Sequence, residues 1–422
     1  MSFAQRLQEI REGFQAPFWV ANATELFERF SYYGVQAVLA IYLSEQLGFS
    51  KERTGELQGY FGFVVWFLPI FGGTLADRFG FRRALVFAYL ILALGYFLMG
   101  SLSAPWMAPL RNAVPLYWLV FAVLMVPALG PSIVKPCVVG TTARAATENV
   151  RSLGYSIYYT VVNIGGTLGP FLASLMRRAI GIENVFRVCA LSVFLMFIAT
   201  LLFYREPVSA GEKPVASVAA AFRNMFVVLS NLKFMLFLLI FSGFWVIFWQ
   251  EFIALPLYIR GYVDPNANID LLLAVDGAAV MLLQVVVTYL TRKIPSFPAM
   301  TLGILISSVS WLILAIRPST PLVILTLVVL ALGEMTQSPR FYEYVSRLAP
   351  PGQQGTFMGF AFLPIAIGFL IAGLIGGRLL HYFGEVRHQP HQVWWVISAV
   401  GFATTLLMWI YNRIVKPGEA SA

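Results

Sequence analysis

The organisation of the chain is decided by one polar stretch, REPVSAGEKPVASVAAAFRN (residues 205–224). It is the longest polar stretch in a 422-residue sequence that is 59% hydrophobic, 12% charged and has a mean hydropathy of +0.76. Apolar runs of roughly 20 residues, each long enough to cross about 30 Å of hydrocarbon, recur on both sides of it. About a quarter of the residues of an ordinary soluble protein are charged, so this composition indicates a polytopic helical membrane protein.

About six apolar spans precede this stretch and about six follow it. Such a plan is typical of transporters built from two pseudo-repeated bundles, with the substrate site near mid-membrane. The predicted fold is therefore all-α, with about twelve transmembrane helices in two six-helix bundles. We expect a cytoplasmic amphipathic segment at 1–16, one bundle at 17–204, a cytoplasmic linker at 205–232, a second bundle at 233–415 and a cytoplasmic tail at 416–422. The expected spans are 17–47, 54–76, 84–103, 115–140, 153–176, 184–204, 234–260, 268–290, 297–316, 320–347, 354–382 and 392–414.

Topology explains the net charge of +9 better than a nucleic-acid partner does. With both termini in the cytoplasm, about 17 of the 29 lysines and arginines fall on the cytoplasmic side, in line with the positive-inside rule. The first residues, MSFAQRLQEIREGF, lack the apolar core of a cleavable signal peptide. The two cysteines lack metal or disulfide spacing. We expect a multi-pass protein of the bacterial plasma (inner) membrane that works as a monomer, needs no cofactor or metal, and binds no nucleic acid.

The first span carries unusual charges in ELFERFSYYG (25–34). Glu25, Glu28, Arg29, Tyr32 and Gln36 are three or four residues apart along much of this run and share one helix face. A charge inside a membrane costs several kcal/mol unless it is paired or hydrated, so this face should point into the bundle or a watery cavity. Protonation of a glutamate would break its pair with Arg29, which predicts proton coupling; a static buried ion pair is the structural alternative.

The loop after the second span reads GGTLADRFGFRR (72–83). It matches, position by position, the G-x-L-A-D-R-x-G-x-[RK]-[RK] loop of the major facilitator superfamily. An aspartate near helix ends and several interfacial arginines suit a latch that holds one conformation. The residues that the resemblance assigns to this conformational loop are Gly73, Asp77, Arg78, Gly80, Arg82 and Arg83.

Four further stretches resemble one branch of that superfamily, the proton-coupled oligopeptide transporters. ELFERFSYYG is similar to its E-x-x-E-R-F-x-Y-Y-G signature. GPSIVKP (130–136) resembles its fourth-helix segment, and YSIYYTVVNIGG (155–166) resembles its fifth-helix signature. LGEMTQSPRFYEYVSRLAP (332–350) resembles its tenth-helix pattern. The resemblance covers both halves of the chain and implies a symporter of di- and tripeptides or peptide-like zwitterions, driven by a proton gradient.

The same resemblance implies roles for individual residues. Lys135, deep in a proline-rich span, would pair with the carboxylate of the cargo, and Glu334, after a long apolar run, with its amino group. For Asn163 and the two tyrosines, core packing is as compatible with the sequence as ligand contact. Proton coupling would involve Glu25, Glu28, Arg29 and Glu334, and the implied substrate-binding residues are Tyr32, Tyr33, Gln36, Lys135, Asn163, Trp245, Trp249, Gln250, Glu334 and Ser338.

The chain also departs from the family pattern. Gln36 stands where peptide transporters usually carry an arginine, and Trp249 stands where its acidic partner is usual. Losing both members of an inter-bundle ion pair is physically consistent, because losing one alone would strand a buried charge. Glu251 follows Gln250 by one residue, and the sequence leaves open whether it replaces the missing acid.

Two other classes of function compete with this one: a transporter with another cargo, and a non-transporting receptor or enzyme. A transporter of non-peptide cargo, such as a siderophore, a drug-like amphiphile or an anion, imported or exported, is favoured somewhat by the altered ion pair. An enzyme is disfavoured because the three histidines, His381, His388 and His391, cluster near one extracellular loop and no nucleophile, phosphate-loop or metal motif accompanies them.

Overall fold

The computed structural model describes residues 12–71, 79–207, 225–348 and 354–415. These residues are almost entirely helical, and an isolated bridge joins Phe14 to Ala146. The chain divides into two units of contacting residues. The first unit contains the described residues of 1–35 and 71–218, and the second contains those of 36–70 and 219–422. The prediction of an all-α architecture is confirmed.

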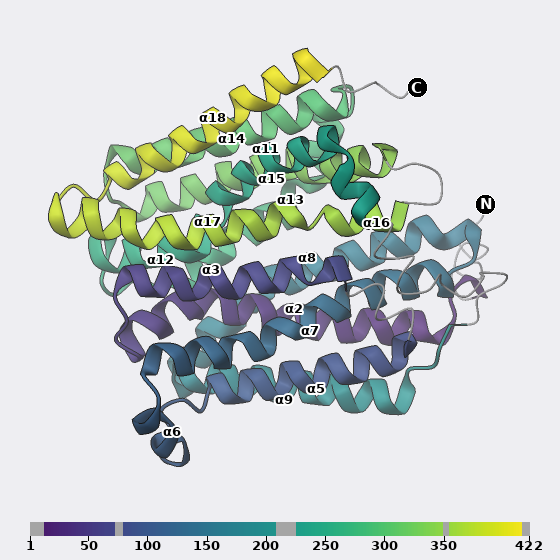
Figure 1. The fold of residues 1–422 in the computed structure, drawn as a ribbon, viewed down its shortest axis with the longest axis horizontal. Coiled ribbons are helices and arrows are strands. Elements are labelled where there is room, and N and C mark those ends of the chain that lie inside the picture. Colours follow the sequence, from purple (N-terminus) through teal and green to yellow (C-terminus); the bar gives the residue numbers. More distant parts are fainter. Residues whose placement is uncertain (1–11, 72–78, 208–224, 349–353, 416–422) are drawn as a thin grey trace. The chain divides into compact units, whose positions relative to one another are not determined.

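The first unit is a bundle in which α5 packs against both α7 and α9, and α8 packs against α7 and α9 (Figure 1). The helix α2 begins in this unit and passes into the second after Val35. The elements are α2 Ala16–Ile41, α5 Phe81–Met99, the 3-10 turn η2 Pro105–Met107, α6 Ala108–Ala113, α7 Leu116–Ala145, α8 Glu148–Ile180 and α9 Ile182–Phe203.

In the second unit, α14 packs against α15 and α18, α13 against α15, and α17 against α3 and α11. Single π-helical turns, η1, η3 and η4, follow α2, α12 and α17. The elements are η1 Tyr42–Gln46, α3 Lys51–Phe67, α11 Leu232–Phe248, α12 Gln250–Tyr258, η3 Ile259–Val263, α13 Ile269–Thr291, α14 Ser296–Ile316, α15 Thr320–Leu348, α16 Gln354–Phe360, α17 Leu363–Leu380, η4 His381–Val386 and α18 Gln392–Val415.

Length and composition identify the membrane-crossing segments. Nine helical segments of the described residues are long and apolar enough to cross a membrane, with mean hydropathies between 1.6 and 2.4. The other three expected spans coincide with α2, α3 and α8, which fall short of those nine in length or hydropathy. The structure therefore confirms the predicted multi-pass membrane protein. The amphipathic segment 1–16, most of the linker and the tail fall largely outside the described residues.

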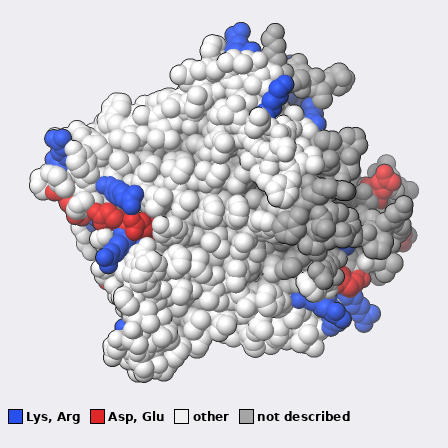
Figure 2. Space-filling model, in the orientation of Figure 1, with Lys and Arg blue, Asp and Glu red and all other residues white. Residues whose placement is uncertain are grey.

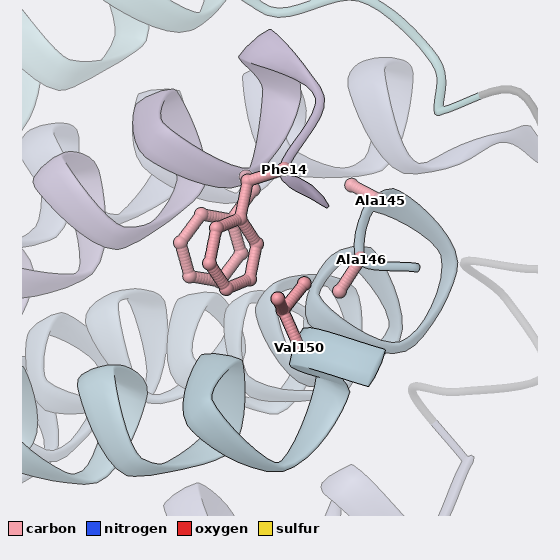
Figure 3. Close-up of a cluster of buried hydrophobic side chains, with 5 residues drawn as sticks. Phe14, Ala145, Ala146 and Val150 are labelled. Atoms are coloured by element: carbon pink, nitrogen blue, oxygen red, sulfur yellow. The ribbon is translucent and has the colours of Figure 1, made fainter. Parts of the chain in front are cut away.

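A small apolar cluster fixes the start of α2 within the first unit. The rings of Phe14 and Phe18 stack with centroids 4.1 Å apart and pack on Ala145, Ala146 and Val150 (Figure 3). Backbone hydrogen bonds from Gln15 to Ala145 and from Thr147 to Gly13 reinforce this contact. The α7–α8 corner thereby holds the helix that carries the charged face predicted from the sequence.

The approach of α3 to α17 depends on glycine. A Cβ atom on Gly55 would lie 2.4 Å from the carbonyl oxygen of Gly373, and a Cβ on Gly373 would lie 2.4 Å from Gly55 O and from the Cα of Gly59. Because these neighbours are backbone atoms, neither could move aside as a flexible side chain does. Small residues let membrane helices pack at close range where burial from water supplies no driving force.

Polar side chains join α3 to η4 at one end of this helix pair. Lys51 Nζ lies 2.7 Å from Glu385 Oε1 and 2.8 Å from the Tyr262 hydroxyl. His381 Nδ1 lies 3.1 Å from Glu52 Oε1, and Arg378 Nη2 lies 2.8 Å from Glu56 Oε1. Figure 2 shows red and blue side chains grouped where α17 ends, while the surface along its length is white. This arrangement is that of a membrane helix whose charges lie at its end.

We predict that Gly373→Ala destabilises the protein by about 1–3 kcal/mol, because the added methyl group collides with backbone atoms of α3. The matched control is Gly261→Ala in η3, where a Cβ would meet nothing within 4 Å. Thermal unfolding of both variants in detergent measures the effect. Equal midpoints for the two variants would contradict the proposed close contact.

Candidate functional site

The first unit holds a buried ion group on α2. Arg29 Nε lies 3.2 Å from Glu25 Oε1 and donates a hydrogen bond to Glu28 Oε2, which also contacts Arg29 Nη2. Both glutamates are 0% exposed and Arg29 is 1% exposed. Glu25 and Arg29 are four residues apart on one helix face, so a single turn brings them together. The predicted charged face therefore points into protein, as its desolvation cost requires.

Glycines of α8 create the space for this group. A Cβ on Gly165 would lie 2.3 Å from the Cβ of Arg29, and one on Gly169 would lie 2.9 Å from the carbonyl oxygen of Phe30. A Cβ on Gly34, in turn, would lie 3.3 Å from Gly169 O. Gly165, in the fifth-helix signature, and Gly169, three residues beyond it, thus allow α8 to cross α2 directly beside Arg29.

Lys135 on α7 completes the group. Its ammonium interacts electrostatically with Arg29, Glu25 and Glu28. Two carboxylates and two cations give a formal charge of zero when all four are ionised. The side chain of Lys135 is half-buried. Pro131 and Pro136 lie on either side of it within α7, and neither has an amide hydrogen to donate to the helix.

Three other predicted residues of the first unit lie near this group in sequence or space. Tyr32 is buried, with its ring 5.2 Å from the Arg29 guanidinium carbon, and Tyr33 is half-buried. Tyr33 lies edge-on to Tyr32, with centroids 5.3 Å apart, and a Cβ on Gly166 of α8 would lie 3.5 Å from the Tyr33 ring. Asn163 is half-buried on α8, where its carbonyl oxygen accepts a hydrogen bond from Thr167.

The second unit holds an aromatic group where α11 gives way to α12. Trp249, the residue between the two helices, is 2% exposed. Its ring stacks on Phe369 of α17 with centroids 4.2 Å apart and lies 6.0 Å from Trp245 and 6.1 Å from Trp66. Phe362 adds a further ring 6.0 Å from Trp66. Aromatic packing from α3, α11 and α17 thus occupies the position where the family pattern has an acid.

The remaining predicted residues of this unit, Gln250, Ser338 and Gln36, are all buried but lie on different helices. Gln250 is fully buried and donates to Ala372 O and Val246 O, both at 3.3 Å, so it joins α12 to α17. Ser338 on α15 accepts a hydrogen bond from the Gln337 amide at 2.7 Å and is 8% exposed. Gln36 on α2 is fully buried.

Three carboxyl groups gather in the second unit. Glu251 on α12 is 0% exposed and interacts electrostatically with Asp276 on α13 and Glu334 on α15. Asp276 is 7% exposed and Glu334 is half-buried. Glu334 was predicted from the sequence, the role of Glu251 was left open, and Asp276 was missed. A single acid inside the apolar run LLLAVDGAAV (271–280) was the available signal.

The described part of the conformational loop is anchored to the end of α9. Glu206 Oε1 accepts a hydrogen bond from the Arg82 backbone amide at 2.7 Å, and Arg82 Nη2 donates to Leu201 O at 2.6 Å. Gly80 has a φ of +84°, and a Cβ there would lie 2.7 Å from Glu206 Oε1. Arg83 is exposed. The predicted residues Gly73, Asp77 and Arg78 lie outside the described residues.

Comparison with known proteins identifies relatives along nearly the whole chain. The Major Facilitator Superfamily pattern matches residues 23–362 and 252–422. The multidrug resistance protein MdtH of Salmonella newport (strain SL254) is 24% identical over 396 residues, which are 92% of this chain and 94% of that protein. The MdtH of Salmonella typhimurium (strain LT2) aligns equally well.

Solved structures share the fold. A POT family transporter in complex with 5-aminolevulinic acid superposes with a TM-score of 0.77 and 19% identity, covering 95% of this chain and 96% of that one. The POT family transporter PepTSo superposes with a TM-score of 0.77 and 17% identity, covering 95% and 98%. The predicted major facilitator fold is confirmed.

We predict that Arg29→Gln destabilises the protein by about 3–5 kcal/mol, because it leaves two buried carboxylates without their shared cation. The triple variant Glu25→Gln, Glu28→Gln, Arg29→Gln should regain part of that loss, since it removes the three charges that α2 contributes and leaves only the half-buried Lys135 charged. Chemical or thermal unfolding in detergent measures both. Arg178→Gln, at an exposed position on α8, is the control and should change stability by less than about 0.5 kcal/mol. A triple variant as unstable as the single one would contradict the electrostatic explanation.

Proposed function

The chain belongs to the Major Facilitator Superfamily, and we propose that it is a proton-coupled symporter of di- and tripeptides or peptide-like zwitterions that works by alternating access. The observation that carries this proposal is the group formed by the buried Glu25, Glu28 and Arg29 with the half-buried Lys135, a charged cluster with a formal charge of zero inside a membrane helix bundle. Intramembrane ionisable residues commonly mark ion or substrate pathways.

Protonation of the group on α2 changes its formal charge and thereby its affinity for an anionic cargo. When Glu28 accepts a proton it loses its charge, and the formal charge of the group rises from zero to +1. Arg29 then retains Glu25 as its carboxylate partner, 3.2 Å away. A group with an excess positive charge attracts an anion more strongly, and within a low-dielectric surrounding this attraction is larger than in water. A proton and a cargo carboxylate would therefore bind with mutual preference, which is the requirement for symport.

Named residues receive roles within this proposal. Lys135 would pair with the carboxylate of the cargo and Glu334 with its amino group, as the resemblance implies. Tyr32, Tyr33 and Asn163 are proposed cargo contacts. The protein would act as a monomer in the plasma membrane with both termini in the cytoplasm, and the proton gradient would be its only source of energy.

A second function is favoured by one comparison and one structural feature. The relatives aligned over 92% of this chain are named multidrug resistance proteins, which supports a non-peptide, drug-like cargo. The stacked rings of Trp249, Phe369 and Trp66 offer aromatic surface to such a cargo. In this case the direction of transport would be export.

Uptake of a labelled dipeptide into proteoliposomes distinguishes the two functions. A peptide symporter should accumulate the dipeptide when an inward proton gradient is imposed and should equilibrate it without one. Excess unlabelled dipeptide should abolish the signal, whereas a lipophilic cationic drug should leave it. Absence of gradient-driven uptake in sealed vesicles, together with gradient-driven movement of the drug, would establish the second function.

Glu28→Gln should abolish stimulation by the proton gradient, because a permanently neutral side chain cannot exchange a proton. Exchange of labelled for unlabelled cargo without a gradient should persist, since the group keeps its +1 charge. The control is Glu148→Gln, at an exposed position in the first turn of α8, which should retain coupling. Unchanged gradient dependence in Glu28→Gln would remove Glu28 from the coupling mechanism.

A further inference from the structure

The carboxyl cluster of the second unit, Glu251, Asp276 and Glu334, differs from the α2 group in having no cation of its own among the residues that the structure describes. Its members come from α12, α13 and α15, and α13 packs against both other helices. Both carboxylate oxygens of Glu251 and Oδ1 of Asp276 are buried and accept no hydrogen bond from the described residues. A fully buried, unpartnered carboxyl group thus lies among two others.

Five basic groups of the surrounding helices form ion pairs outside the cluster. Arg260 of η3 pairs with Glu45, Arg378 of α17 with Glu56, and Lys51 of α3 with Glu385. Arg340 and Arg347 of α15 both pair with Glu343. The electrostatic environment of Glu251 contains the carboxyl groups of Asp276 and Glu334, that of Asp276 contains Glu334, and no cation of the described residues contributes to either. The other ionisable residues on the elements packed against α12, α13 and α15 are Glu52, Arg53, Tyr60, Lys233, Tyr258, Tyr262, Asp270, Tyr289, Tyr342 and Tyr344, and α14 and α16 carry none.

Three negative charges cannot remain together at this place. Each buried charge bears a desolvation penalty, and each also repels its neighbours through a medium of low dielectric constant. Carboxyl groups that share a buried site avoid both costs by keeping one or more protons, as paired carboxyl groups do in general. A carboxylate as buried as Glu251 can be neutralised by a proton, because a proton needs no channel wide enough for a larger cation.

We propose that Glu251, Asp276 and Glu334 form a second proton-binding site, separate from the group on α2. The proposal deepens the proposed function, on which it rests for its role in transport: the carrier would bind protons at two places, one in each unit. The site is built from Glu251, one residue beyond the position of the usual seventh-helix acid, and from Asp276 on the following helix. The proton is shared among the three carboxyl groups, and loss of either Glu251 or Asp276 reduces the repulsion that retains it.

Thermal stability as a function of pH tests the site without transport. If the folded protein holds a proton that the unfolded chain releases, the folded state binds more protons and stability falls as the pH rises above about 4, the ordinary range of carboxylic acids. We expect the melting temperature of the full chain in detergent to fall between about pH 5 and pH 9. Glu251→Gln and Asp276→Asn should each flatten this slope and raise the midpoint at high pH.

Two controls make the result specific. Asp264→Asn removes a half-buried carboxylate whose oxygen accepts a hydrogen bond from the Asn266 amide in the loop before α13, and it should keep the wild-type slope. Glu28→Gln should leave unchanged the part of the slope that Glu251→Gln removes. Slopes in Glu251→Gln and Asp276→Asn that match the wild type would overturn the proposal.

Infrared titration covers the case in which the variants do not fold. The wild-type protein should show a carboxyl stretching band of an acid without hydrogen bonds that persists above neutral pH, and Glu251→Gln should lose intensity in it if it folds. Absence of that band in the wild type would overturn the proposal. Loss of gradient-driven uptake by the wild type, with the band and the slope intact, would instead contradict the proposed function and leave the proton site standing.

Discussion

The constraint on which the structure depends is that a charged side chain inside the membrane must meet an opposite charge or give up its own. Hydrocarbon offers no water to solvate an ion. A charged residue in a membrane span therefore needs a partner of opposite charge, or a proton that makes it neutral. In the first unit the answer is pairing: Arg29 lies between two carboxylates of its own helix. The pairing requires space, and the glycines at 165 and 169 of α8 supply it because any side chain there would collide with α2.

The second unit gives a different answer to the same constraint. Its carboxyl cluster, with Glu251 and Asp276 buried and Glu334 half-buried, has no basic neighbour within the described residues, while Lys51, Arg260 and Arg378 of the adjoining elements pair at helix ends. Pairing and protonation have opposite consequences for a transport protein. A paired group gains an excess positive charge when it takes up a proton, whereas an unpaired acidic group gains negative charge when it loses one. Under the proposed function, the two units would therefore suit cargo groups of opposite sign.

Much of the fold follows from the sequence because hydropathy and helix length are local properties. Each expected span coincides with a helical segment, and the charged face of α2 was predicted from spacing alone. Contacts between helices were harder to predict from the sequence. Asp276 was missed because nothing in LLLAVDGAAV shows that α12 and α15 bring further acids to it. Gln250 was predicted as a cargo contact from the resemblance, but its hydrogen bond to Ala372 depends on where α17 lies, which no local pattern encodes.

The replacement of the family's usual ion pair by the aromatic packing of Trp249 affects which cargo the protein can bind. Trp249 occupies the acidic position of the family pattern, and its ring packs on Phe369 and near Trp66. Replacing a buried ion pair by well-packed apolar groups is often neutral or stabilising, so the fold tolerates the change. The electrostatic effect on transport is not neutral. Under the proposed function, a cargo with a carboxylate would bind together with a proton at the α2 group, which would produce symport. A purely cationic cargo would compete with a proton at the half-buried Glu334, which would produce exchange. The net charge of the cargo would thus set the sign of the coupling, and the same two groups of residues would serve either function without a change of fold.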